Sequence, residues 1–167
     1  MKKYSYILAA ALFVAGCNGG NPKGTGAGNA GSAYDKDAEL GEVKKGIVAG
    51  SQQDLEVRAG NVINFEFDKH ALTPEATRIL KKQAAWLKLF PKTDIIIEGH
   101  CDDRGTRKYN QALGERRANA AKRFLVAQGI PAARISTVSY GKDRPVALGD
   151  TEAAHAKNRR DVTIVAK

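Results

Sequence analysis

The sequence predicts an α+β domain, a two-layer α/β sandwich in which helices pack on one mixed sheet. Three observations predict it. After residue 51, β-branched runs alternate with longer amphipathic runs in the order βαβαβαβ. Before that point, residues 17–50 are rich in glycine and poor in large apolar residues, and residues 1–16 resemble a leader. We therefore divide the chain into a signal peptide (1–16), a tether (17–50) and a folded domain (51–167).

The leader, "MKKYSYILAAALFVAGC", has two lysines before a short apolar run. That run is too short for a permanent membrane span, which needs roughly 20 residues. It ends in "VAGC", a pattern typical of a bacterial lipobox, so we expect lipidation at Cys17. Ordinary cleavage near Gly16 is the alternative. Asn18 replaces the aspartate typical of inner-membrane retention, which favours the outer membrane.

The tether follows. Nine of the 17 glycines fall between Gly19 and Gly50. Such a segment cannot bury enough apolar surface to offset the entropy of ordering it, so we expect a flexible arm. A glycine-rich coil of this length spans roughly 30 Å on average.

The first half of the domain contains two predicted strands and a helix. The stretch "NVINFEF" (61–67) alternates like a strand. The helix "TPEATRILKKQAAWLKLF" (73–90) has Thr73 as N-cap, Pro74 at its first position and Pro91 as its stop. The β-branched "TDIIIEGH" (93–100) predicts a central strand buried on both faces.

The second half repeats the pattern. A long helix is expected from about residue 106 to 128, because Gly129 and Pro131 form a common C-terminal signature. A strand at 133–141, a short helix at 151–160 and a closing strand at 161–167 complete the order.

The net charge is +9 and favours anionic partners such as lipid headgroups or cell-wall polymer. Nucleic acid is set aside, because a secreted lipoprotein meets little of it. With Cys17 lipidated, Cys101 is a lone thiol and no internal disulfide forms.

The polar stretch "EGHCDDRG" (98–105) is the first candidate site. Strand alternation puts Glu98, His100 and Asp102 on one side, with Cys101 facing away. A zinc site needs more ligands, and the only other histidines, at positions 70 and 155, form no recognisable pair. There is no serine elbow or Cys–His pair either. We expect no catalytic residue, metal or cofactor here.

The second helix gives the stronger clue. Arg117 lies within an otherwise apolar face formed by Tyr109, Asn110, Leu113, Ala120 and Phe124. A buried unpaired guanidinium is costly, so Arg117 either forms an internal salt bridge or serves a ligand. In the second case Asp102 and Arg117 open onto one pocket. Asp102 then takes an ammonium, and Arg117 takes a carboxylate bidentately.

Four motifs, "FEFDKHALTPEA", "IEGHCDDRGTRKYNQALGERRA", "VSYGKDRPV" and "KNRRDV", follow the lipobox and tether. Together, over about residues 51–166, they resemble the peptidoglycan-associated lipoproteins, the OmpA-like domain family of the Tol–Pal system. The resemblance implies an OmpA-like domain that binds the meso-diaminopimelate of peptidoglycan, and TolB as a partner. It also implies the site residues, which are Phe67, Asp68, Lys69, Asp102, Asn110, Leu113 and Arg117.

Other residues carry smaller expectations. Cys101 replaces the threonine or alanine usual in the family, and we expect a buried, inert thiol. Arg104 and Gly105 are expected to shape the loop, and Arg116 to be solvated or ion-paired. Asn158 and Arg159 either support the pocket or cap a helix.

The function expected is that of an outer-membrane lipoprotein whose periplasmic domain holds peptidoglycan non-covalently, in envelope integrity and cell division. It is not an enzyme. An envelope adaptor whose main partner is a periplasmic protein is the alternative, followed by a peptidoglycan hydrolase.

Overall fold

The computed structural model describes residues 39–42 and 45–166. The predicted signal peptide, the lipidation site at Cys17 and most of the tether lie outside the described residues. The described elements are α1 (Gln52–Arg58), β1 (Val62–Asn64), α2 (Pro74–Leu89), β2 (Ile95–His100), α3 (Arg107–Ala127), the 3-10 helix η2 (Ala132–Arg134), β3 (Ile135–Gly141), α4 (Glu152–Asn158) and β4 (Arg160–Val165). This confirms the predicted fold class and adds a leading helix, α1.

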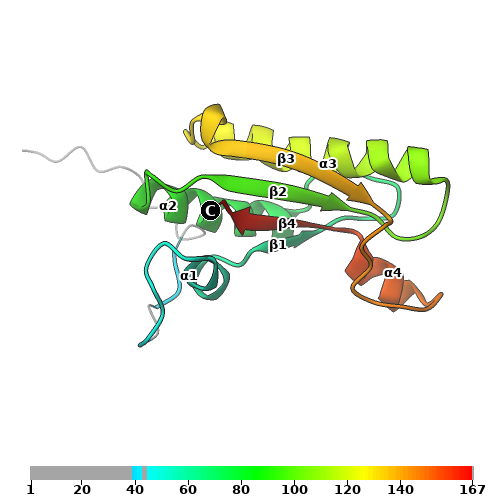
Figure 1. Cartoon of the computed structure of the whole chain (residues 1–167), viewed down its shortest axis with the longest axis horizontal. Coiled ribbons are helices and arrows are strands. Elements are labelled where there is room, and N and C mark those ends of the chain that lie inside the picture. The colour runs from blue at the N-terminus through cyan, green and yellow to red at the C-terminus, as the bar shows by residue number, and fades with distance from the viewer. Residues whose placement is uncertain (1–38, 43–44, 167) are drawn as a thin grey trace, which may run out of the picture. The chain divides into compact units, whose positions relative to one another are not determined.

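The four strands form one mixed sheet in the order β1-β4-β2-β3. β2 and β3 are parallel, whereas β4 is antiparallel to both β1 and β2. The last strand of the chain therefore lies inside the sheet, between the first two strands (Figure 1).

The core lies between the sheet and the helices on one of its faces. Ile95 and Ile97 of β2 belong to one buried cluster with Leu80 and Leu87 of α2 and Leu125 of α3. α1, which the sequence analysis did not predict, joins this core. Its Ser51 cap accepts from the Asp54 amide, and Trp86 Nε1 donates to Asp54 Oδ2 at 2.9 Å.

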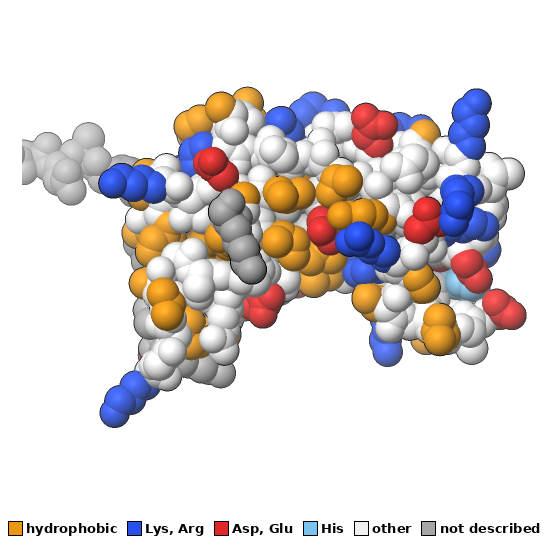
Figure 2. Space-filling view, in the orientation of Figure 1, with side chains coloured by type: hydrophobic (Ala, Val, Ile, Leu, Met, Phe, Trp, Pro, Cys, Tyr) orange, Lys and Arg blue, Asp and Glu red, His pale blue; other side chains and the backbone are white. Residues whose placement is uncertain are grey.

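The prediction that β2 is buried on both faces is wrong. Ile96 and Glu98 are only half-buried, because α2 and α3 cover just one face of the sheet. Figure 2 shows hydrophobic side chains gathered over the strands on the uncovered side. The side chains of β2 therefore alternate between a sheet face covered by helices and a sheet face that is partly exposed.

β1 is shorter than predicted, since it ends at Asn64. The chain then turns through Asp68, whose φ of 56° is in the left-handed region. Such a conformation is uncommon outside glycine and is tolerated by aspartate. The turn leaves Phe67 at 54% exposure, so that it extends over a pocket instead of pairing in the sheet.

α3 lies very close to β2. A Cβ built on Gly99 would come within 2.0 Å of the Gly114 carbonyl oxygen, so both positions need glycine. The buried face of α3 also differs from the one expected. Tyr109 is exposed and Ala120 and Phe124 are half-buried, and the buried residues are Asn110, Leu113, Gly114, Arg117, Ala118, Ala121 and Leu125.

Candidate functional site

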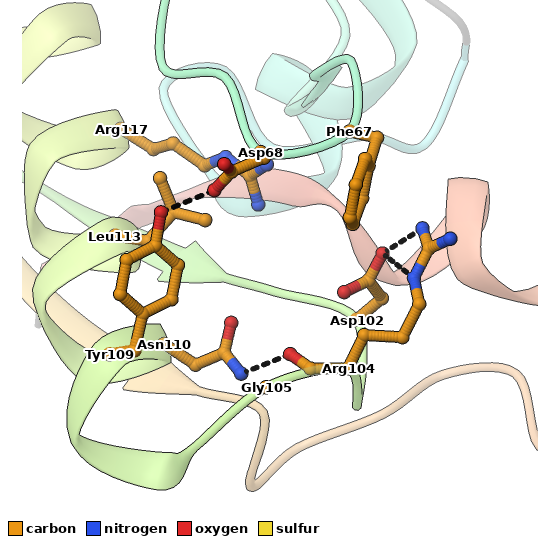
Figure 3. A pocket seen from close by; sticks show the side chains of 9 residues that line it. All are labelled: Phe67, Asp68, Asp102, Arg104, Gly105, Tyr109, Asn110, Leu113 and Arg117. Atoms are coloured by element: carbon orange, nitrogen blue, oxygen red, sulfur yellow. Dashed lines mark hydrogen bonds and ion pairs between the residues drawn. The ribbon is translucent and has the colours of Figure 1, made fainter.

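A pocket of about 170 Å³ lies beyond the end of β2 (Figure 3). Three segments form it: the turn after β1, the loop after β2 and the first three turns of α3. Its lining residues are Phe67, Asp68, Asp102, Arg104, Gly105, Tyr109, Asn110, Leu113 and Arg117. Segments distant in the sequence thus bring two acids and two arginines to one small cavity.

Six of the seven residues expected from the family resemblance line this pocket. Lys69 does not line it. Its ammonium pairs with Glu66 on the surface, while its backbone carbonyl accepts from Arg117 Nε at 2.9 Å. Tyr109 is a lining residue that the sequence analysis assigned only to the helix face. Its hydroxyl donates to Asp68 Oδ1 across the mouth of the pocket.

Asp102 is 4% exposed, and one of its oxygens is fully engaged. Oδ2 accepts from Arg104 Nε at 3.1 Å and from Arg159 Nη1 at 3.3 Å. Burial alone would raise the pKa of Asp102, but the hydrogen bonds from Arg104 and Arg159 outweigh it and hold the pKa below its ordinary value. Oδ1 accepts no hydrogen bond from a described residue and faces the pocket (Figure 3).

Arg117 is completely buried and holds backbone in place. It donates to the carbonyls of Lys69 and His100 at 2.9 Å and of Glu66 at 3.2 Å, and Nη1 also lies 3.5 Å from Cys101 Sγ. The Arg117 guanidinium is therefore not paired with an aspartate among the described residues, and backbone carbonyl groups accept its hydrogen bonds instead. Of its five N–H groups these contacts use four, which leaves one Nη2 hydrogen for a ligand.

That count changes the expected binding mode. A bidentate grip on a carboxylate needs two parallel N–H groups, and the second would have to leave the Glu66 carbonyl. Burial lowers the pKa of Arg117, although Cys101, Asp161 and Asp102 oppose the shift. The charged guanidinium stays dominant at neutral pH because the ordinary value lies far above 7.

Asp161 of β4 is a buried acid that the sequence analysis missed. It pairs with Gly99 of β2 in the antiparallel register, is 1% exposed, and neither carboxylate oxygen has a hydrogen-bond partner among the described residues. Burial raises the pKa of Asp161, and the nearby Arg117 charge opposes the shift. No pattern in "KNRRDV" distinguishes it from a solvated strand residue.

His100 and Cys101, from the polar stretch 98–105, lie in environments that differ from that of Asp102. His100 stacks on Tyr140 with ring centroids 5.5 Å apart, outside the pocket, and burial lowers its pKa to about 4. Cys101 is buried, as expected. Its thiol donates to the Asn110 carbonyl at 3.4 Å, and burial raises its pKa to about 11. In the part of the chain that the structure describes, no group of three or more His, Cys, Asp or Glu could hold a metal.

Two arginines support the pocket. Arg159 joins Asp102 to Glu152 of α4, at 3.3 and 2.8 Å, and donates to the Phe65 carbonyl. Arg104 lies 3.9 Å over the Phe67 ring while pairing with Asp102. Asn158, by contrast, holds the loop before α4 through the backbone of residues 146 and 147, away from the pocket.

Comparison with known proteins shows the family to which the chain belongs. Residues 64–159 match the model of the OmpA family. The chain is similar to the peptidoglycan-associated lipoprotein of Agrobacterium fabrum, with 43% identity over 95% of this chain and 84% of that protein. It is similar to the one from Pseudomonas aeruginosa, with 46% identity over 96% of both.

Two solved structures share the fold of this domain. The crystal structure of the peptidoglycan-associated lipoprotein from Burkholderia pseudomallei superposes with a TM-score of 0.62 and 40% identity, covering 64% of this chain and 90% of that one. The C-terminal domain of Helicobacter pylori MotB shares the fold, with a TM-score of 0.60, 24% identity, and coverage of 64% and 84%. Of the helices in the described segments, none has the length and hydrophobicity needed to cross a membrane.

Proposed function

Since the chain belongs to the OmpA family and, within it, to the peptidoglycan-associated lipoproteins, we propose that the protein binds peptidoglycan and leaves the polymer chemically unchanged. The bound protein would thereby attach the cell wall to the outer membrane. The ligand group would be the meso-diaminopimelate of the stem peptide, and the anchor the lipid on Cys17. The names of the relatives support binding to peptidoglycan and a lipid anchor, since each is called a peptidoglycan-associated lipoprotein.

One observation carries the choice of ligand. Asp102 and Arg117 present a carboxylate oxygen and a guanidinium hydrogen to the same cavity of about 170 Å³, without bonding to each other. A ligand that satisfies both must carry a positive and a negative group a few ångströms apart. The free amino-acid end of diaminopimelate is such a group.

Each wall of the pocket then has a role. Asp102 Oδ1 accepts the ammonium, and the remaining Nη2 hydrogen of Arg117 donates to the carboxylate. Leu113 and the Phe67 ring contact the methylene chain between the two ends of the ligand. Asn110 Nδ2 donates to the Arg104 carbonyl at 2.7 Å, which fixes the loop that carries Asp102.

The mechanism is equilibrium binding. Single clamps of this kind gain strength when many copies on one membrane meet one polymer. The periplasmic orientation, the Tol–Pal role in envelope integrity and cell division, and the partner TolB are part of the same proposal. A peptidoglycan hydrolase is disfavoured, because His100 lies outside the pocket and no serine, threonine or cysteine lines it.

The test is co-sedimentation of residues 17–167, carrying Cys17→Ser, with purified walls that contain either diaminopimelate or lysine. Wild type should pellet only with the diaminopimelate wall, and Asp102→Asn should stay in the supernatant while remaining folded. Release of wall fragments would support the hydrolase. If wild type and Asp102→Asn pellet equally with the diaminopimelate wall and the lysine wall, the binding is a general charge attraction and not recognition of diaminopimelate. If TolB binding survives Asp102→Asn, the adaptor surface is separate from the pocket.

A further inference from the structure

A second groove, of about 420 Å³, runs along α3 beside the pocket. Its lining residues are His70, Glu115, Arg116, Asn119 and Arg123. The helix contributes positions 115, 116, 119 and 123, and the last three recur at spacings of three and four and so lie on one face. Seven residues of helix cover roughly 10 Å at 1.5 Å per residue, which is about the length of three extended peptide residues.

The groove adjoins the pocket through shared backbone. His70 directly follows Lys69, whose carbonyl accepts from Arg117, and Arg116 directly precedes Arg117 in α3. The Arg116 guanidinium carbon also lies 5.8 Å from the centroid of the Tyr109 ring, which lines the pocket. The groove and the pocket are therefore neighbours along α3.

The groove carries uncompensated positive charge. Neither Arg116 nor Arg123 forms an ion pair with any residue in the described ranges 39–42 and 45–166. Two guanidiniums face one carboxylate, that of Glu115, so the lining has a formal charge of +1 with His70 neutral. Most other arginines around the pocket are held by acids or by carbonyl groups, as Arg104 and Arg159 are. Exposed, unpaired guanidiniums are suited to an external carboxylate.

We propose that this groove is a second carboxylate subsite, which binds a free carboxylate on the residue next to diaminopimelate in the same stem peptide. The proposal rests on the proposed function, because diaminopimelate in the pocket sets the position of the peptide. In such stems the preceding residue is a glutamate linked through its γ-carboxyl, so its α-carboxylate is free. Arg116 and Arg123 would hold that carboxylate, and Asn119 would donate a neutral hydrogen bond.

The experiment compares two synthetic tripeptides by calorimetry, both containing meso-diaminopimelate after γ-linked glutamate. One keeps the glutamate α-carboxylate, and in the other it is a neutral amide. The protein is residues 17–167 with Cys17→Ser. We expect the acid peptide to bind about fivefold more tightly, the amount an exposed ion pair of good geometry provides. In the double variant Arg116→Gln, Arg123→Gln, the acid peptide should bind only as tightly as the amide peptide does. The affinity for the amide peptide should not change.

A charge-matched control is Lys88→Gln with Lys92→Gln, at the far end of α2 and in the turn after it, where both lysines are exposed. This variant should keep the full preference for the acid peptide. Equal affinity of wild type for both peptides overturns the subsite, and so does an equal loss for both peptides in the arginine variant. In those outcomes Asp102→Asn still abolishes binding and the proposed function stands. If wild type binds neither peptide, the proposed function fails as well.

Discussion

Asp102 and Arg117 face one pocket, and each is held in place by other groups. Asp102 Oδ2 is fixed by Arg104 and Arg159, and Arg117 is fixed by the backbone carbonyls of the chain around it. Because neither charge neutralises the other directly, both are available to a ligand before it arrives. A preorganised pair loses less free energy on binding than one that must first separate.

Arg117 is predicted to matter for stability as much as for binding. Arg117→Ala would remove a donor from three backbone carbonyl groups and leave a cavity where a fully buried side chain was packed. We expect the free energy of unfolding to fall by about 3–5 kcal/mol, measured by urea denaturation. The neighbouring exposed Arg116→Ala is the control and should change it by less than about 0.5 kcal/mol. Similar values for the two variants would contradict the structural role.

The contact between α3 and β2 predicts a strong effect at Gly99. In Gly99→Ala the new methyl would meet the Gly114 carbonyl oxygen at 2.0 Å, and both are backbone positions that cannot move independently. We expect a loss of about 3 kcal/mol or more in the free energy of unfolding. Gly149→Ala is the control, because its φ of 102° is unfavourable for alanine but nothing lies within 4 Å of the new methyl, so it measures backbone conformation without a steric clash. Its cost should be about 1 kcal/mol, and a Gly99 cost no larger than this would argue against the close approach.

His100 predicts an acid-dependent loss of stability. Burial lowers its pKa from 6.5 to about 4, so the folded domain favours the neutral ring. This stabilisation is complete above pH 6.5 and is lost as the pH falls toward about 4, up to about 3 kcal/mol. His100→Phe keeps an aromatic ring against Tyr140 and does not titrate. From pH 7 to pH 4 the wild type should therefore lose up to about 3 kcal/mol of unfolding free energy relative to His100→Phe, because carboxyl titrations common to both proteins cancel. A difference between the two proteins that does not change with pH would contradict the burial.

Cys101 is predicted to be unreactive in the folded protein. It is 3% exposed, and its pKa of about 11 leaves almost no thiolate at pH 8. In the Cys17→Ser chain, a thiol reagent should label Cys101 at least about a hundredfold more slowly than in denaturant, since reaction requires opening of the site. Fast labelling at native conditions would mean that the region between β2 and α3 opens readily.

The order of strands and helices could be predicted from the sequence because apolar periodicity and capping residues are local signals. Thr73 and Thr106, for example, cap the helices that follow them. The bonding of Arg117 could not be predicted, since its acceptors are backbone carbonyls of residues 66, 69 and 100, and carbonyls carry no sequence signal. Asp161 was missed for a related reason, because only strand pairing places it next to Gly99.

The location of β4 between β1 and β2 determines when this domain can fold. β1 pairs with no strand other than β4 in the described sheet, and β4 (Arg160–Val165) follows the other three strands in the sequence. Because β4 separates β1 from β2, the sheet cannot be completed until the segment Arg160–Val165 is available to pair with both. Pairing between segments so far apart in the sequence is slow to form, so we expect the complete sheet to appear late in folding, after the local helices.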